Sequence, residues 1–270
     1  MEQIVSRQVL QCDGGTCQID NHDLIREEPL LIRIEGKPYS VVMRTPGEEN
    51  CHVAGFCLSE GLVDQPEEIA TLGYCNEIDG NVATVTLKPA RRDKVSALLE
   101  RRGFMSQTSC GICGKELIKD LCQFLVPVTD DTRIKVSDAL RCVDQLSGHQ
   151  QLYERTRGSH AALLFDPKLE LLAVAEDVGR HNALDKAIGR AFLNRKLADV
   201  FLGVLSSRIS YELVQKAARA QTAILIGMSR PTALAVELGQ TLNMTLACTG
   251  EKSGLMVFSG KERLNGGLKP

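Results

Sequence analysis

The sequence predicts an α/β protein, α+β overall, with a largely buried sheet in its second half and a smaller mixed α/β part before it. Two patterns predict this class. From residue 160 onward, short apolar runs alternate with amphipathic helical segments, which is typical of a sheet covered by helices. Before that point, a hairpin signal is mixed with isolated helical patterns. The 270 residues suffice for one large domain or two modest ones.

The first third predicts a hairpin, two helices and a further strand. Two apolar runs surround Glu-Gly-Lys-Pro within residues 30–45, which favours a β-hairpin. Thr-Pro-Gly-Glu at residues 45–48 predicts a helix start, with threonine as the cap, and Gly61 predicts the end of that helix. Residues 82–89 alternate as a strand does, and residues 91–103 predict a second helix.

The remaining two thirds predict helices and then strands that alternate with helices. Strands are expected at residues 160–165, 169–177, 198–206, 223–229 and 244–249, the last being the final strand. Helices are expected at residues 114–125, 137–153, 181–193, 210–220 and 231–242. The first two strands are joined by a turn at Asp166-Pro167.

Composition and charge exclude several classes of function. The formal net charge of −2 argues against binding of bulk nucleic acid, and the absence of tryptophan argues against base-stacking surfaces. We find no signal peptide and no apolar run long enough to span a membrane, so we expect a cytoplasmic protein. Its ten cysteines are then expected to be reduced, and a disulfide scaffold is not expected.

SQTSCGICGKE, residues 106–116, places Cys110 and Cys113 three residues apart at the start of a helical pattern. Thr108 and Ser109 can cap that helix, so both sulfurs fall in its first turn. There the helix dipole favours a thiolate, and Lys115 adds positive charge. These features favour a nucleophilic cysteine on a mobile loop.

Two other uses of this cysteine pair stay open. A structural zinc site needs two more ligands, and only Cys12 and Cys17 offer a further cysteine pair near this spacing. No second Cys-x-x-Cys and no His-x-Glu occurs, so a deaminase-type zinc site is not expected. A thioredoxin-like dithiol would follow an early strand in a small βα unit, whereas this pair follows a helix in mid-chain.

Polar residues cluster where the predicted strands of the second half end. AEDVGRHNALDKAIG, residues 175–189, follows a strand, turns on a glycine and opens a helix, and loops at 154–160, 206–212 and 228–233 add arginines. Ligands bind at this edge in α/β folds, and helix starts favour anions. The candidates are Arg157, His160, Arg180, His181, Asn182, Lys186, Arg208, Ser229 and Arg230. Each also has a plain structural interpretation, such as a helix cap for His181 or a solvated helix face for Lys186.

Several of these stretches together resemble the FdhD/NarQ family of formate dehydrogenase accessory sulfurtransferases. The resemblance rests on RTPGEENCHVAGFCLSEGLV (44–63), SCGICGKE (109–116), RGSHAALL (157–164), EDVGRHNALDKAIG (176–189), SSRISYELVQKAARA (206–220) and SRPTALAVELGQTLNMTL (229–246). They occur in the family's order through most of the chain.

The resemblance implies a sulfurtransferase. Cys110 would carry a persulfide received from an L-cysteine desulfurase, with Cys113 as its companion. The sulfur would pass to the molybdenum (or tungsten) bis-molybdopterin guanine dinucleotide cofactor of formate dehydrogenase, and no metal site of the protein's own is implied. The resemblance further implies a homodimer and a cytidine-deaminase-like, three-layer C-terminal domain at residues 117–270. A mixed α/β part at 1–105 and a mobile loop at 106–116 would precede it.

The family's cofactor-binding segment corresponds to CTGEKSG, residues 248–254, which carries fewer basic residues than the family pattern. The resemblance adds Thr249, Gly250, Lys252 and Gly254 as cofactor-binding candidates, contacting a moiety like guanosine diphosphate. A cofactor-binding chaperone that transfers no sulfur is the main alternative function, and a dithiol redox protein is another.

Overall fold

The structure is a computed structural model that describes residues 2–75, 81–102, 125–250 and 254–265. Its C-terminal half is built on a six-stranded sheet of order β13-β12-β11-β10-β8-β9. The strands are β8 (His160–Phe165), β9 (Leu171–Asp177), β10 (Leu202–Arg208), β11 (Ile224–Ser229), β12 (Thr245–Thr249) and β13 (Leu255–Ser259). β10, β11 and β12 are parallel, whereas β8 and β13 are antiparallel to their neighbours.

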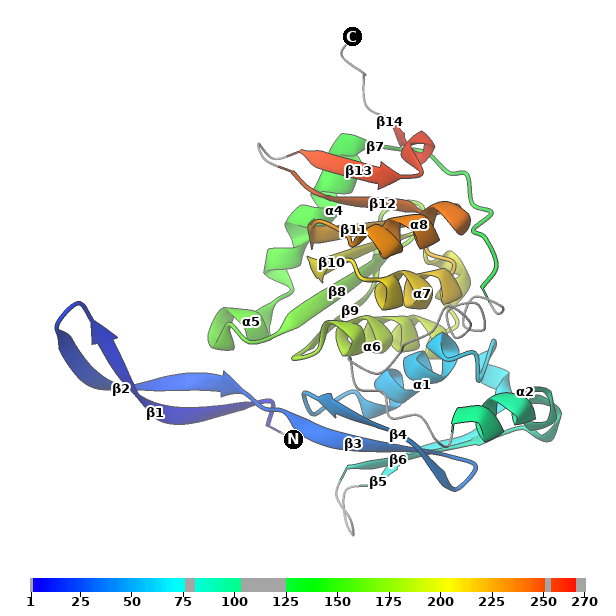
Figure 1. Ribbon diagram of the computed structural model, residues 1–270, viewed down its shortest axis with the longest axis horizontal. Helices are drawn as coiled ribbons and strands as arrows, with labels where there is room; N and C mark the ends of the chain where they lie inside the picture. Colours follow the sequence, from blue (N-terminus) through cyan, green and yellow to red (C-terminus); the bar gives the residue numbers. More distant parts are fainter. Residues whose placement is uncertain (1, 76–80, 103–124, 251–253, 266–270) are drawn as a thin grey trace.

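Helices cover both faces of this sheet (Figure 1). α6 (Arg180–Leu193), α7 (Tyr211–Arg219) and α8 (Ala233–Thr241) follow β9, β10 and β11 and lie on one face. α4 (Val136–Gly148) lies on the other face and leads to α5 (Gln151–Thr156). Short β7 (Ile134–Lys135) and β14 (Leu264–Asn265) pair with each other.

The N-terminal half contains a four-stranded sheet of order β4-β3-β6-β5. Its strands are β3 (Glu28–Ile34), β4 (Lys37–Arg44), β5 (Ile69–Cys75) and β6 (Val82–Leu87), and α2 (Pro89–Arg102) follows β6. The predicted hairpin is β3–β4. Its two-residue turn is Glu35-Gly36, with φ of 52° and 74°, the left-handed conformation that suits a hairpin turn.

α1 (Glu49–Ser59) lies between α6 and the four-stranded sheet and joins the two halves (Figure 1). Its residues 52–58 are all buried, which is typical of a helix with neighbours on every side. α1 and α6 approach so closely that a Cβ added at Gly55 would lie 1.9 Å from the Asp185 carbonyl oxygen. A Cβ added at Gly189 would lie 1.8 Å from the Cys51 carbonyl oxygen. Glycine is therefore required at this crossing.

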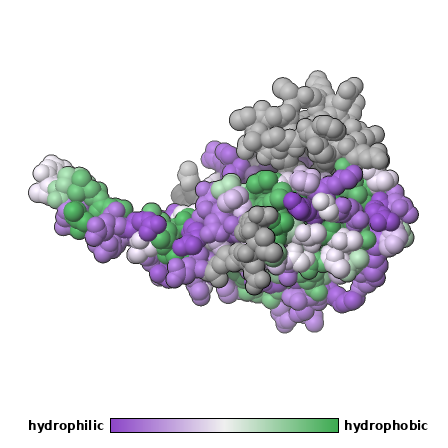
Figure 2. Space-filling view, turned by 90° about the horizontal axis from the view of Figure 1, so that it is seen from below, coloured by the Kyte–Doolittle hydropathy of each residue, from purple (hydrophilic) through white to green (hydrophobic). Residues whose placement is uncertain are grey.

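A long hairpin arm projects from the body, and the sequence patterns did not predict it (Figures 1 and 2). It is formed by β1 (Ile4–Asp13) and β2 (Thr16–Ile25), which pair along their whole length. Its residues are mostly polar and mostly exposed, so no period-2 apolar pattern marks the strands. At its base, Arg155 of α5 forms an ion pair with Asp23 over 2.6 Å.

The mixed α/β class is confirmed, and several element predictions need correction. The helix expected at 137–153 is interrupted, because α4 ends at Gly148 and α5 begins at Gln151. β12 is not the final strand, since β13 and β14 follow it. Thr45 does not cap α1, because its hydroxyl oxygen accepts the Val178 N–H instead, at 3.0 Å. The helix expected at 114–125 lies outside the described residues, save its last position.

The expectation of fully reduced cysteines is also wrong in this structure, because Cys12 and Cys17 form a disulfide across the arm. The domain boundaries and the cytidine-deaminase-like identity of the C-terminal half stay predictions. In the described part of the chain, no helix combines the length and the apolar character needed to cross a membrane.

Candidate functional site

The sheet register brings the predicted polar residues to one edge of the six-stranded sheet. β8 starts where β9 ends, with His160 opposite Asp177, and β10 and β11 end together at Arg208 and Ser229. β12 ends beside them at Thr249. We call this edge, made of residues 157–160, 178–182, 206–212, 228–232 and 249–250, the polar edge. α6, α7 and α8 all begin at it.

His160 is held in place by Ser206 of β10. The hydroxyl oxygen of Ser206 accepts the Ala161 N–H at 2.9 Å and lies 3.2 Å from Nδ1 of His160. Burial lowers the pKa of His160, and the positive charges of Arg180 and His181 lower it further. A neutral imidazole with its proton on Nε2 fits this arrangement, because the Ser206 hydroxyl can then donate to Nδ1.

His181 lies at the start of α6 and contacts the start of α7. Its Nε2 is 2.8 Å from an Oε of Glu212 and 3.2 Å from the Ser210 hydroxyl oxygen. The hydrogen bond from His181 lowers the pKa of Glu212. Sequence reasoning selected His181 but missed Glu212, Ser210 and Ser206, although it singled out the loop that contains them. Pairing between loops is not visible in a single sequence.

The polar edge offers several unpaired donors for an anion. Arg180 has a buried Nε with no hydrogen-bond partner. The side chains of Arg208 and Arg230 are exposed, and we find no hydrogen bond or ion pair from either guanidinium group to another described residue. No side chain caps α6 or α7, so the dipole at the start of each helix is available to favour an anion. Arg157, exposed at the end of α5, stacks on the Tyr153 ring with its Cζ 5.3 Å from the centroid.

Two of the predicted residues point into the protein instead. Lys186 is fully buried, donates to the Thr45 carbonyl at 2.8 Å and pairs with Asp177 at 2.7 Å. Asn182 donates to the Met43 carbonyl at 2.7 Å and to Asp177 at 2.9 Å. These contacts hold α6 against the N-terminal half. Ligand contact by either residue stays a prediction, and for Lys186 it would require the buried pair to open.

The loop after β12 contributes less than the others. The Thr249 hydroxyl donates to the Met228 carbonyl at 3.1 Å. The Gly250 N–H donates to the Gly254 carbonyl at 2.7 Å, which brings the two ends of this loop together. Lys252 lies outside the described residues, as do Cys110 and Cys113, so their predicted roles are not tested by geometry.

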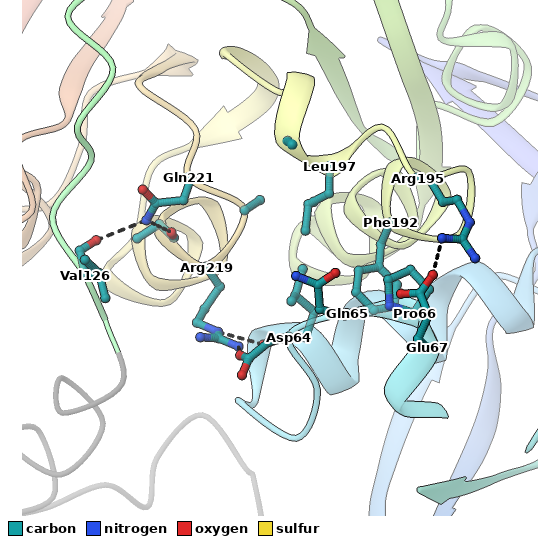
Figure 3. Close-up of a pocket in the computed structure, with 14 residues that line it drawn as sticks. Asp64, Gln65, Pro66, Glu67, Val126, Phe192, Arg195, Leu197, Arg219 and Gln221 are labelled. Carbon is teal, nitrogen blue, oxygen red and sulfur yellow. Dashed lines mark hydrogen bonds and ion pairs between the residues drawn. The ribbon is translucent and has the colours of Figure 1, made fainter. Parts of the chain in front are cut away.

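A cavity of about 430 Å³ lies at the opposite ends of α6 and α7 (Figure 3). Phe192 and Leu197 line it, and Arg219, paired with Asp64 at 2.7 Å, closes one side. The side chain of Gln221 donates to the Val126 carbonyl at 3.1 Å. The charged groups that line this cavity are already paired with each other, and most of its surface is apolar. The cavity therefore suits an anion less well than the polar edge does.

The residues that the structure describes contain no group of histidine, cysteine and carboxylate side chains placed to hold a metal ion. Cys12 and Cys17, which the zinc alternative would need as ligands, are bonded to each other. The zinc alternative therefore loses its second pair of sulfurs.

Comparison with known proteins gives consistent matches over most of the chain. The sequence model of the FdhD/NarQ family matches residues 25–265. A protein named sulfur carrier protein FdhD from Streptomyces coelicolor is 35% identical over 271 residues, covering 96% of this chain and 94% of that protein. One of the same name from Mycobacterium tuberculosis is 37% identical, covering 88% and 90%. A crystal structure assigned as a formate dehydrogenase accessory protein from Desulfotalea psychrophila superposes with a TM-score of 0.78 at 21% identity, covering 98% and 100%.

Proposed function

Because this chain belongs to the FdhD/NarQ family, we propose that it is a sulfur carrier that serves formate dehydrogenase. The observation that carries this proposal is the Cys110–Cys113 pair, which lies within the matched residues 25–265. The names of the relatives support the sulfur-carrier role, and they extend over most of this chain. The cytoplasmic location and the homodimer expected from the sequence stay predictions.

In the first step, the Cys110 thiolate attacks the outer sulfur of a persulfide on an L-cysteine desulfurase. The bond between the two donor sulfurs breaks, the donor cysteine leaves as a thiolate, and Cys110 carries the persulfide. The sequence predicts a helix start at Cys110, where the dipole and Lys115 would favour a thiolate, so this role fits Cys110.

In the second step, the sulfur must leave Cys110 at the oxidation level of sulfide, which requires two electrons. The Cys113 thiolate can supply them by attacking the inner sulfur, so that a Cys110–Cys113 disulfide forms and the outer sulfur departs as HS⁻. This assigns the release of sulfur to Cys113 and its capture to Cys110. A reductant of the dithiol class would then restore the pair.

The acceptor we propose is molybdenum bis-molybdopterin guanine dinucleotide, bound as substrate through its phosphates at the polar edge. The unpaired Nε of Arg180 and the exposed guanidinium groups of Arg208 and Arg230 fit a diphosphate, as do the uncapped starts of α6 and α7. His160 lies at the same edge, at the start of β8.

Intact mass spectrometry after incubation with a cysteine desulfurase and L-cysteine tests the first step. The wild type should gain one sulfur, about 32 Da, that a reductant removes, and Cys110→Ala should not. Cys113→Ala should still gain the sulfur but should release far less sulfide. No gain in the wild type would overturn the carrier proposal.

The chaperone alternative makes a different prediction for the same variants. If the protein only binds and delivers the cofactor, Cys110→Ala should still yield active formate dehydrogenase in a strain that lacks the wild-type copy. Loss of formate dehydrogenase activity, together with unchanged binding of guanosine diphosphate, would exclude the chaperone alternative.

A further inference from the structure

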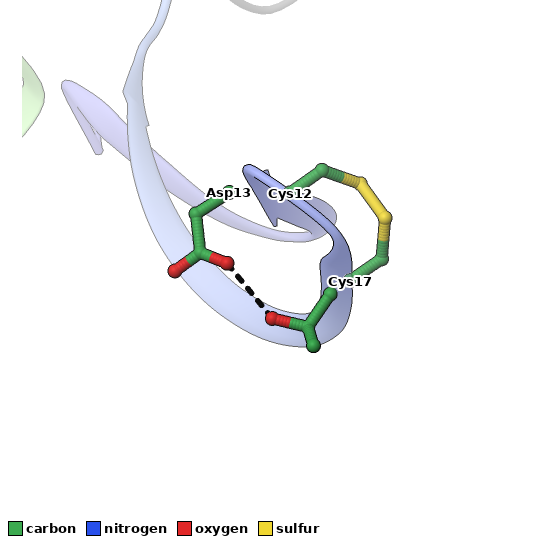
Figure 4. Close-up of a disulfide and its surroundings, with 4 residues drawn as sticks. Cys12, Asp13 and Cys17 are labelled. Atoms are coloured by element: carbon green, nitrogen blue, oxygen red, sulfur yellow. Dashed lines mark hydrogen bonds between the residues drawn. A yellow bond between two sulfur atoms is a disulfide. The ribbon is translucent and has the colours of Figure 1, made fainter.

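The tip of the hairpin arm carries the Cys12–Cys17 disulfide, which no step of the proposed sulfur transfer uses (Figure 4). Cys12 and Cys17 are directly opposite each other on β1 and β2, with their Cα atoms 4.1 Å apart. Both residues are exposed. Neither β1 nor β2 belongs to the sheets of the body, so the disulfide is presented away from it (Figure 1).

This disulfide does little to hold the fold together. It joins residues only five apart, and the stabilisation from a disulfide grows with the length of the loop that it closes. The hairpin is already closed by the two-residue turn at Gly14-Gly15 and by a hydrogen bond of 2.8 Å from the Thr16 hydroxyl to the Asp13 carboxylate. A structural staple is therefore a weak explanation for two cysteines at this position.

The disulfide has apolar neighbours on the same face of the arm. Side chains two apart in a strand share a face, so Leu10 and Ile19, which are opposite each other, lie beside Cys12 and Cys17. Leu10 is 65% exposed and Ile19 is 73% exposed. Apolar residues gather toward the end of the arm in Figure 2. Leu24, also exposed, is on the opposite face, paired with Val5.

We propose that Cys12 and Cys17 form a thiol–disulfide exchange site for a dithiol protein. Leu10 and Ile19 pack against the apolar side chains that surround the thiols of that protein. Exposed disulfides are the ones that exchange readily, because a thiolate can reach either sulfur. Two large apolar side chains beside the disulfide favour a protein reductant over a small polar thiol, which would leave them uncovered.

The reaction balances with that partner. A thiolate of the dithiol protein attacks one sulfur, the Cys12–Cys17 bond breaks, and the other cysteine leaves as a thiolate that takes up a proton. The second thiol of the partner then attacks the mixed disulfide. The partner ends as a disulfide, and Cys12 and Cys17 end as two thiols, having gained two electrons and two protons.

The test measures reduction of this disulfide directly, because a tryptic peptide of residues 8–26 contains Cys12 and Cys17 and no other cysteine. The oxidised full-length protein is treated with a thioredoxin-type reductase system or with dithiothreitol at equal dithiol concentration. Samples are alkylated over time and quantified by mass spectrometry. We expect the protein reductant to be faster by about tenfold or more.

Leu10→Ser with Ile19→Ser should lower the rate with the protein reductant to near that with dithiothreitol, whose own rate should not change. Leu24→Ser is the matched control, since it removes an exposed leucine from the opposite face and should leave both rates unchanged.

Equal rates with the two reductants, or a protein-driven rate insensitive to Leu10→Ser and Ile19→Ser, would overturn the proposal and leave a passive cross-link. The peptide excludes Cys110 and Cys113, so either result is independent of the sulfur-carrier proposal.

Discussion

Asp177 uses both carboxylate oxygens to connect the end of β9 with the N-terminal half of the chain. One oxygen accepts the Thr45 N–H at 3.1 Å and pairs with Lys186, and the other accepts the Gly179 N–H at 2.8 Å and the Asn182 amide. Both charged side chains are fully buried. A buried carboxylate is tolerated when its oxygens accept enough hydrogen bonds and ion pairs to replace water. Here the partners of Asp177 come from both halves of the chain.

Lys186→Met should therefore cost about 3–5 kcal/mol of stability, because it leaves the Asp177 charge buried and unpaired. Urea unfolding measures this as a lower midpoint. Lys168→Met removes an exposed lysine at the β8–β9 turn and controls for the lost charge. A loss below about 1 kcal/mol, the range of exposed pairs, would contradict the structural role.

Arg208→Ala and Arg230→Ala should each weaken binding of guanosine diphosphate by about tenfold, because each removes a charge-assisted contact with a phosphate. Both side chains are exposed, so the midpoint of unfolding should change little. Isothermal titration calorimetry measures the affinity. Arg141→Ala, on α4 and 71% exposed, is the control and should bind as the wild type does. Unchanged affinity in both Arg208→Ala and Arg230→Ala would mean that guanosine diphosphate does not bind at the polar edge.

Sequence alone predicted which residues lie at the polar edge but not which way they point. Strand ends and helix starts can be located from periodicity, and parallel strands bring their ends to one edge, so Arg180, His181 and Arg208 were found. Asn182 and Lys186 follow on the same helix, yet they donate to the carbonyls of Met43 in β4 and of Thr45 just after it, more than a hundred residues earlier. Which residues pack against a helix face depends on tertiary contacts, and these are not visible in the local sequence pattern.

At the scale of elements, the α1–α6 crossing determines how the two halves meet. Two glycines face each other there, and the backbones come closer than any side chain would permit. Lys216 of α7 adds an ion pair with Asp185 of α6, at 2.6 Å, and Ser59 at the end of α1 donates to the same carboxylate at 2.8 Å. Arg219 donates to the carbonyls of Leu58, in the last turn of α1, and of Val63, which follows the helix.

Gly55→Ala and Gly189→Ala should each destabilise the protein by about 3 kcal/mol or more, because the new methyl group overlaps a backbone carbonyl of the facing helix. Gly148→Ala, at the end of α4 with no atom within 4 Å of the added Cβ, is the control. It should be neutral or slightly stabilising, since alanine favours helix by up to about 1 kcal/mol over glycine. Thermal unfolding compares the three, and similar midpoints for all would contradict the close crossing.

Elements were predictable from sequence where a face is buried and unpredictable where none is. The buried strands and amphipathic helices after residue 160 follow the expected periods. The arm does not, because β1 and β2 have solvent on both faces and their pairing depends on the turn at Gly14-Gly15. β5 was not predicted from the sequence for a related reason, because its inward-facing side chains are only half-buried.

At the scale of the whole molecule, stability depends on groups that are buried in their neutral form. Burial holds the pKa of His52 well below its usual range, and the charges of Lys186, Lys216 and Arg44 lower it further. Burial raises the pKa of the Cys57 thiol to about 12. Both residues are on α1, fully enclosed between the two halves. Their titration therefore reports on opening of the whole interface.

The signs of these two shifts predict a stability maximum between about pH 6.5 and 8.5. Below about pH 6.5 the unfolded chain protonates His52 and the folded one does not, so the free energy of unfolding falls by up to about 1.4 kcal/mol per pH unit. His160, whose pKa is also lowered, adds to this slope. Above about pH 8.5 the unfolded chain ionises Cys57 while the folded chain keeps the thiol, so stability falls again.

Urea unfolding at half-unit steps from pH 5 to pH 9 measures both slopes. Asp64 and Glu212 have lowered pKa values, so their contribution is lost only below about pH 4.5, outside this range. His52→Gln should reduce the slope of the free energy of unfolding below about pH 6.5 by up to about 1.4 kcal/mol per pH unit, the effect of one proton. The slope above about pH 8.5 should not change. His22→Gln, which removes an exposed histidine from the arm, separates burial from the loss of a histidine as such. An acid slope that His52→Gln leaves intact would mean that α1 is not enclosed between the two halves in solution.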